Sequence, residues 1–121
     1  METRQQKGRR SEEVAAEFLS KKGMEIVARN VRCLFGEIDL ICRTGKTTVF
    51  VEVKSRYAHR FGLPQESVSR TKQKKLTRLA QWYLKSKGLE RQPARFDVVA
   101  ILWKGGEAEL TWIVNAFEAS E

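Results

Sequence analysis

Residues 36–56, GEIDLICRTGKTTVFVEVKSR, join two hydrophobic strand-like runs that carry charged side chains inside them. The runs flank TGK, a turn signal, and so predict a β-hairpin. The first run contains Glu37 and Asp39, and the second contains Glu52 and Lys54. Because side chains alternate between the two faces of a strand, Glu52 and Lys54 share one face, roughly 7 Å apart. Glu37 and Asp39 likewise share one face of the first strand.

The pairing of this hairpin decides whether the acids of the two strands meet. Asp39 lies opposite Glu52 if the loop spans residues 44–47, and opposite Phe50 if it spans residues 44–45. Both pairings put the charged side chains of the two strands on a common face, whereas a loop of odd length does not. The hairpin is therefore expected to gather two acids and a lysine.

The rest of the chain alternates helical and strand patterns. An apolar period of 3.6 residues predicts a helix, and runs of β-branched and aromatic residues predict strands. The expected elements are a helix over 8–22, strands over 24–33 and within 36–56, a helix from about 64 or 65 to 87, and strands over 94–103 and 108–114. No repeat or flexible linker interrupts the 121 residues, so a single α/β domain over residues 1–121 is expected.

One acid of the first helix is expected to face the sheet. At 100° per residue, Glu12 falls on the same side of the helix as the apolar residues Ala15, Ala16 and Leu19. Its carboxylate is therefore predicted to approach the acids of the hairpin.

Charges inside a hydrophobic segment need a partner, because an unpaired buried charge is costly. One interpretation is a structural ion pair of Lys54 with Glu52 or with Asp39. The other is a hard divalent cation, because several acids facing one lysine leave an excess of negative charge that oxygen-liganded cations neutralise. An inward Glu12 increases that excess.

The overall charge indicates a polyanionic partner. The chain has 23 Lys and Arg against 15 Asp and Glu, a net charge of +8, which favours nucleic acid as the partner. The candidate contacts lie on the polar side of the second helix and in the loop before it. They are Lys72, Lys74, Lys75 and Arg78 on the helix, and Arg56, Arg60 and Gln65 near the loop. A merely solvated surface is the alternative for both groups.

The remaining sequence features concern the location of the protein and residues that are not expected to form the site. The chain has no apolar run near the ~18 residues of a membrane helix and no hydrophobic signal region, so a cytoplasmic location is expected. Cys33 and Cys42 lie outside any CxxC pattern and are expected to be reduced. The lone His59 is expected to be solvated. Asp97 is expected to be a structural acid that pairs with Arg95 or with a neighbouring basic side chain.

Several of these segments resemble known nucleases. Asp39 followed by Glu52-Val53-Lys54 resembles the PD-(D/E)xK nuclease superfamily, although Ile38 stands where the superfamily's name has proline. The spacing of Gly8, Glu12, Ala15, Leu19 and Gly23 resembles the first helix of archaeal Holliday-junction resolvases. The ordered set GEIDLI, VFVEVKSR, FGLPQESV, RFDVVAI and NAF resembles the YraN-type family of small bacterial proteins over almost the whole chain.

The resemblance implies a restriction endonuclease-like fold and a metal site. The fold would be an α-β-β-β-α-β core with a mixed central sheet flanked by helices, followed by a C-terminal strand. Asp39, Glu52 and the main-chain carbonyl of Val53 would bind Mg²⁺ or Mn²⁺. Lys54 would orient or deprotonate the attacking water, and Glu12 would bind a second ion or act through a water. Glu37 would support the site from outside.

The implied function is metal-dependent cleavage of phosphodiester bonds. DNA is the favoured substrate, with branched or otherwise structured DNA suggested by the likeness to resolvases. The alternative is a nucleic-acid-binding module that keeps the nuclease fold without catalysis. The resemblance leaves the oligomeric state open, with a homodimer as one expectation.

Overall fold

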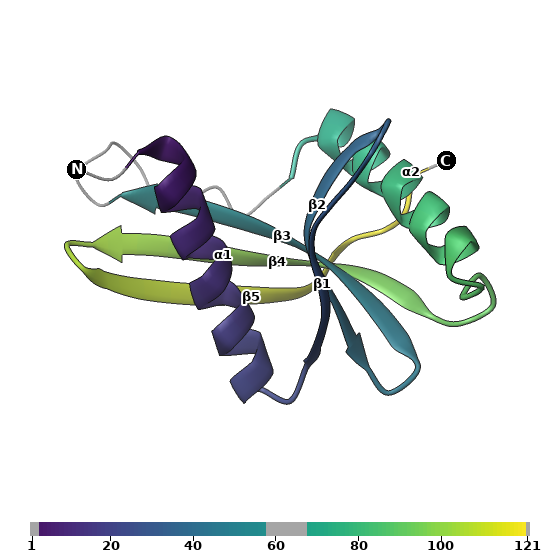
Figure 1. The fold of residues 1–121 in the computed structure, drawn as a ribbon, viewed down its shortest axis with the longest axis horizontal. Coiled ribbons are helices and arrows are strands. Elements are labelled where there is room, and N and C mark those ends of the chain that lie inside the picture. The colour runs from purple at the N-terminus through teal and green to yellow at the C-terminus, as the bar shows by residue number, and fades with distance from the viewer. Residues whose placement is uncertain (1–2, 58–67, 121) are drawn as a thin grey trace.

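The computed structural model describes residues 3–57 and 68–120 and shows the expected restriction endonuclease-like order of elements (Figure 1). The elements are α1 (Arg4–Lys21), β1 (Glu25–Cys33), β2 (Gly36–Thr44), β3 (Thr47–Tyr57), α2 (Arg70–Ser86), β4 (Ala94–Lys104) and β5 (Glu107–Phe117). The predicted α-β-β-β-α-β core with an additional C-terminal strand is confirmed. No described helix is long and apolar enough to cross a membrane.

The strands form one mixed sheet in the order β1-β2-β3-β4-β5. β3 and β4 run parallel, because α2 connects them, and the other neighbouring pairs are antiparallel. Strand alternation sends Val49 and Val51 into the core under α1 and sends Phe50 into the core under α2. The two helices therefore cover opposite faces of the sheet, with α2 beside the β1–β2 hairpin in Figure 1.

The β2–β3 hairpin adopts one of the two predicted pairings. Leu40 pairs with Val51 and Thr44 pairs with Thr47, which is the pairing that sets Asp39 opposite Glu52. The strands continue one pair further than expected and leave Gly45-Lys46 as the turn. Gly45 has a φ of +59°, a left-handed conformation that glycine adopts without steric cost.

The sheet forks at the carboxylate-bearing part of this hairpin. Among the described residues, β2 pairs with β3 only over Leu40–Thr44 and Thr47–Val51. Past that point, β2 continues beside β1 and β3 continues beside β4, so the two strands diverge in Figure 1. The fork leaves room for side chains between two strands that remain hydrogen-bonded on their other sides.

The second helix begins later than predicted. Ser69 is its N-cap and accepts a hydrogen bond from the N–H of Lys72 at 3.2 Å, so the helix starts at Arg70 and not at 64 or 65. The apolar period misplaced the start because Val68 is buried in the α2-side core without being helical. Residues 58–67, including His59, Arg60 and Gln65, lie outside the described residues.

Candidate metal centre at the fork of the sheet

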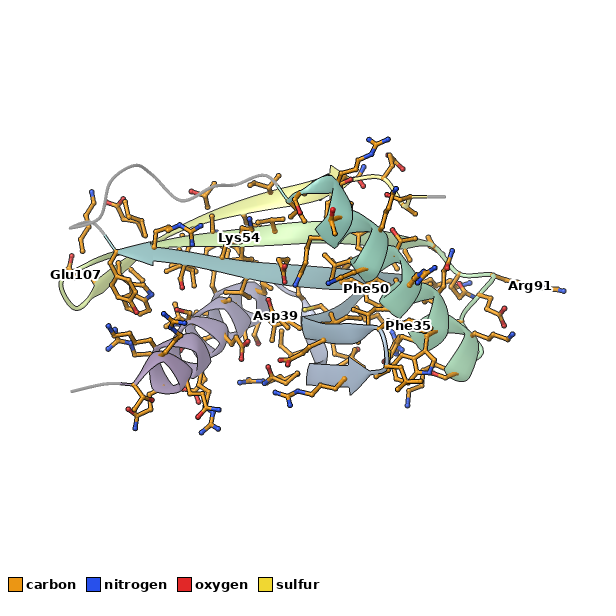
Figure 2. All side chains as sticks on the ribbon, turned by 90° about the horizontal axis from the view of Figure 1, so that it is seen from above. Phe35, Asp39, Phe50, Lys54, Arg91 and Glu107 are labelled. Carbon is orange, nitrogen blue, oxygen red and sulfur yellow. The ribbon has the colours of Figure 1, made fainter. Side chains whose placement is uncertain are left out.

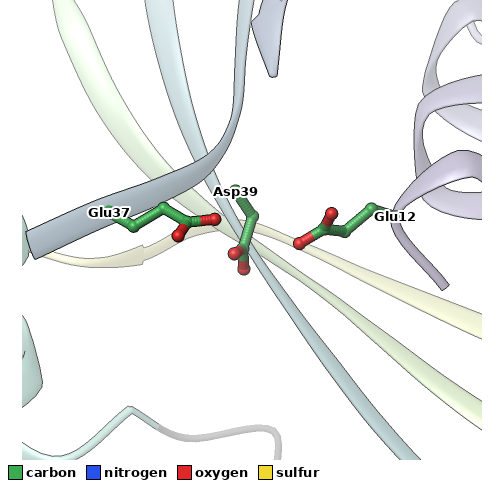
Figure 3. Close-up of side chains that lie close together, drawn as sticks. All are labelled: Glu12, Glu37 and Asp39. Atoms are coloured by element: carbon green, nitrogen blue, oxygen red, sulfur yellow. The ribbon is translucent and has the colours of Figure 1, made fainter. Parts of the chain in front are cut away.

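Three carboxylates from two elements converge at the fork. Glu12 comes from α1, and Glu37 and Asp39 come from β2. One oxygen of each lies within 4.8 Å of an oxygen of the other two. Figure 3 shows the carboxyl groups of Glu12 and Glu37 on either side of that of Asp39. This arrangement concentrates negative charge in one place.

Helix packing turns Glu12 toward the acids, as its position on the helix predicted. Ala15, Ala16 and Leu19 on the same side of α1 are fully buried against the sheet. Burial raises the pKa of Glu12, and the charge of Glu37 raises it further, while a hydrogen bond from Asn30 lowers it. The carboxylate is therefore held close to other acids at an electrostatic cost.

Asn30 of β1 connects two of the acids. With its amide nitrogen facing them, Asn30 donates to the two oxygens of Glu12 at 3.0 and 3.2 Å and to Oε1 of Glu37 at 2.8 Å. The pairing of β1 with β2 sets Asn30 opposite Asp39, because the flanking positions pair Arg29 with Leu40 and Val31 with Ile38. Asn30 has a φ of +51°, which asparagine tolerates better than most residues.

Asp39 connects this cluster of acids to β3. Its Oδ2 accepts a hydrogen bond from the N–H of Val53 at 2.8 Å, across the opening of the fork. Its carboxyl group also hydrogen-bonds to that of Glu52, which requires a proton on one of them. Burial, followed by the hydrogen bond and the charge of Glu52, raises the pKa of Asp39 from 3.8 to about 9. The N–H of Val53 opposes this rise.

Glu52 is the most buried acid of the predicted site. It is 8% exposed, and its Oε2 lies 3.3 Å from Nζ of Lys72 on α2. Lys72 was predicted only as a nucleic-acid contact, whereas the structure places its ammonium at the candidate metal centre. Lys54 lies two positions after Glu52 on β3 and is half-buried. Figure 2 shows Lys54 displaced along β3 from Asp39 of β2.

The other three residues of α2 that were predicted to contact nucleic acid form a separate surface. Lys74, Lys75 and Arg78 line an open hollow of about 510 Å³ together with polar side chains of α2 and Ser120. Lys72 is not among its lining residues, so the basic side predicted for this helix divides in two. Arg56 is exposed, and its guanidinium donates to the carbonyl of Ser55 at 3.0 Å.

Asp97 has the structural role that was predicted for it. It is fully buried and accepts hydrogen bonds from the guanidinium of Arg95 at 3.0 and 3.3 Å. The indole N–H of Trp112 and the backbone N–H of Asn115 also donate to it, each at 2.9 Å. Asp97 thereby ties β5 to β4 through both side-chain and backbone donors, and its oxygens are engaged away from the fork. Cys33 and Cys42 are free, as expected.

Comparison with known proteins establishes the family. Residues 11–101 match the model of a family described as "Uncharacterised protein family UPF0102". The chain belongs to the UPF0102 family. A UPF0102 protein of Desulfosudis oleivorans is 47% identical over 97% of this chain and 94% of its own length. UPF0102 proteins of Symbiobacterium thermophilum and Syntrophotalea carbinolica are 49% and 43% identical over 93% and 92% of this chain, and over 96% and 90% of their own lengths. The resemblance to the YraN-type family is thereby confirmed.

The acids of this UPF0102 member suit a hard divalent cation. Carboxylate oxygens are the ligands that Mg²⁺ and Mn²⁺ prefer, and the fork contains no competing thiol or imidazole among the described residues near the acids. Burial and the neighbouring Glu52 raise the pKa of Asp39 to about 9, as expected where carboxylates are crowded together without a compensating cation. The donor set therefore fits the ion that the sequence led us to expect.

Sequence reasoning missed Asn30 and underestimated Glu37. Asn30 lies within a predicted strand. Alternation along that strand does not indicate that its amide contacts acids of two other elements. Glu37 was expected outside the site, but its carboxylate joins the cluster and is held by Arg32, whose Nε donates to it at 2.8 Å. An asparagine inside a predicted strand, between Arg29 and Val31, was the one available signal, because asparagine is depleted in strands.

Proposed function

We propose that the protein is a metal-dependent phosphodiesterase, an endonuclease that acts on DNA. The observation that carries this proposal is the convergence of Glu12, Glu37 and Asp39 at the fork, with the pKa of Asp39 raised to about 9 by burial and by the neighbouring Glu52. Catalytic sites concentrate such perturbed groups, whereas a purely structural ion pair would balance its charges.

Asp39, Glu52 and the main-chain carbonyl of Val53 would hold Mg²⁺ or Mn²⁺ in this proposal. Glu12 would contribute to a second ion or act through a water, and Glu37 would complete the acidic side. A bound divalent cation stabilises charge on phosphoryl oxygens and lowers the pKa of water in phosphodiester hydrolysis. Asp39 would give up its proton when the cation binds, because a protonated carboxyl is a poor ligand.

The lysines would act on the substrate side of the site. Lys54 shares the strand face of Glu52 and would orient or deprotonate the attacking water. The side chain of Lys72 is 43% exposed, so its ammonium can contact both Glu52 and a phosphate that enters the fork. Both lysines would offset the negative charge that develops on the phosphate.

Two substitutions separate catalysis from structure. Glu52→Ala removes an oxygen ligand and is expected to weaken Mn²⁺ binding measured by calorimetry. Lys54→Ala is expected to leave Mn²⁺ binding in place and to abolish cleavage of DNA. Glu17→Ala is the control, because Glu17 is exposed and pairs with Lys21 along α1 at 3.0 Å.

Two results would contradict the proposal. If the parent protein binds no divalent cation and both substitutions merely lower the melting temperature, the charges form a structural cluster. If the protein binds the cation but cleaves neither linear, flapped nor four-way-junction DNA, nor structured RNA, the nuclease proposal fails.

The alternative is a nucleic-acid-binding module without catalysis, which the basic hollow of α2 favours. Each phosphate neutralised by Lys or Arg releases counterions, so affinity for DNA should fall steeply with salt. Replacing Lys72, Lys74 and Lys75 together with Ala should flatten the slope of log K against log salt by about 0.9 for each phosphate that is no longer neutralised. Lys104→Ala, at a residue paired with Glu109 on the β4–β5 hairpin, is the control. An unchanged slope would assign these lysines to ordinary solvation.

A further inference from the structure

The turn between β1 and β2 presents two apolar side chains to solvent. Leu34 is 101% exposed and Phe35 is 43% exposed, which makes Leu34 the most exposed large hydrophobic residue among those described. We call Leu34 and Phe35 the apolar tip. A side chain that is wholly in water contributes nothing to the core, so burial does not account for a leucine at this position.

The apolar tip is held against α2. Gly36, which follows it, has a φ of +130°, and a Cβ added there would lie 3.7 Å from Leu79 of α2. The N–H of Phe35 donates to Sγ of Cys33 at 3.4 Å. The guanidinium of Arg78 lies 5.9 Å from the centre of the Phe35 ring, and Figure 2 shows Phe35 beside the helix. The tip therefore has a defined position.

Arg78 joins the apolar tip to the basic hollow. The same side chain that lies over Phe35 also lines the hollow of about 510 Å³, together with Lys74 and Lys75. Arg32, two residues before Leu34, has a side chain that is 78% exposed and paired with Glu37. The result is an apolar projection beside the basic hollow of α2.

We propose that this composite surface binds an unpaired DNA strand, with a base against the apolar tip and its phosphates in the basic hollow. Proteins that bind single strands combine a positively charged groove with side chains on which unstacked bases rest. A second copy of this chain is a poorer occupant, because each copy has a net charge of +8 and cations border the patch. The inference rests on the proposed function and specifies its substrate as duplex DNA with an adjoining unpaired strand.

The position of the tip predicts where such DNA would be cut. Phe35 precedes Asp39 by four positions on nearly continuous β structure, which corresponds to roughly 13 Å. At about 3.4 Å per nucleotide of a duplex strand, cleavage is expected about four nucleotides from the base that rests on the tip, with the intervening strand stacked as in a duplex.

The test measures binding without metal, so that it does not depend on catalysis. Fluorescence anisotropy in EDTA compares a blunt duplex with the same duplex carrying a single-stranded extension. The variants are Leu34→Ser with Phe35→Ser, and as a control Val114→Ser, because Val114 is 49% exposed on β5. We expect the protein to prefer the extended duplex, and the double variant to lose roughly tenfold in affinity for it while binding the blunt duplex unchanged. The control should retain the preference.

Three outcomes would overturn the inference. The first is a protein that binds both DNAs equally, and the second is a double variant that keeps the full preference. The third is a double variant whose sedimentation shifts from dimer to monomer without loss of DNA discrimination, which would make the tip a self-interface. A protein that discriminates between the DNAs but cleaves neither supports this inference and refutes only the nuclease proposal.

Discussion

Replacing Asp39 with Asn is predicted to stabilise the metal-free protein at neutral pH. The carboxyl of Asp39 accepts the N–H of Val53 and hydrogen-bonds to Glu52, and its pKa is raised to about 9. The amide introduced by Asp39→Asn can accept the same N–H and donate to Glu52. The amide therefore has the hydrogen-bonding groups of the protonated carboxyl at every pH. The variant lacks the free-energy cost that the wild type incurs either by ionising Asp39 or by keeping it protonated.

The sign and size of the effect follow from proton linkage. Between the ordinary pKa of 3.8 and the raised value of about 9, folded Asp39 retains a proton that the unfolded chain releases. The free energy of unfolding of the wild type therefore falls as pH rises through this window, by up to about 1.4 kcal/mol per pH unit. From about pH 5.5 to about pH 7.5, the variant should gain on the order of 2–3 kcal/mol relative to the wild type. Glu12, whose pKa is also raised, contributes to both proteins and largely cancels in the difference.

Urea unfolding followed by circular dichroism, in EDTA at several pH values, measures this difference. Glu17→Gln on the exposed side of α1 is the control and should follow the wild-type pH dependence. Saturating Mg²⁺ should narrow the gap, because a ligand that binds the native wild type at about 100 times its Kd stabilises it by about 2.7 kcal/mol. A gap between Asp39→Asn and wild type that does not change with pH would refute the reasoning, because it would mean that Asp39 is ionised in the fold.

Three further predictions concern residues at the site, in the core and at the start of α2. Asn30→Gly keeps the left-handed backbone but removes the amide that donates to Glu12 and Glu37. Mn²⁺ binding measured by calorimetry should weaken by roughly tenfold or more, while the melting temperature should change little. Asp97→Ala leaves Arg95 without its buried partner and should lower the free energy of unfolding by about 3–5 kcal/mol in urea. Mn²⁺ binding should stay intact. A decrease below about 1 kcal/mol would contradict the buried network. Ser69→Ala removes the N-cap of α2 and should cost about 1 kcal/mol in the same assay, whereas Ser69→Asp should cost little.

Local periodicity determined which acids face the interior. Alternation along the strands and the 3.6-residue turn of the helix are properties of a few consecutive residues, so they are readable without knowledge of the rest of the fold. They placed Glu12 on the buried side of α1 and aligned Asp39 with Glu52, apart from a choice between two pairings. The turn at Gly45-Lys46 decided that choice, because it closes the hairpin with Thr44 opposite Thr47.

Only the tertiary structure determined how these acids are partnered. The fork between β2 and β3 depends on each strand continuing beside a different neighbour, and it brings Glu37 and Asn30 to the same point as Glu12. Lys72 and Lys74 are almost adjacent in sequence, yet one pairs with Glu52 and the other lines the basic hollow. The raised pKa of Asp39 likewise arises from burial and from carboxylates supplied by other elements. Distances between elements depend on how helices and strands pack across the sheet, and periodicity within one element contains no information about them.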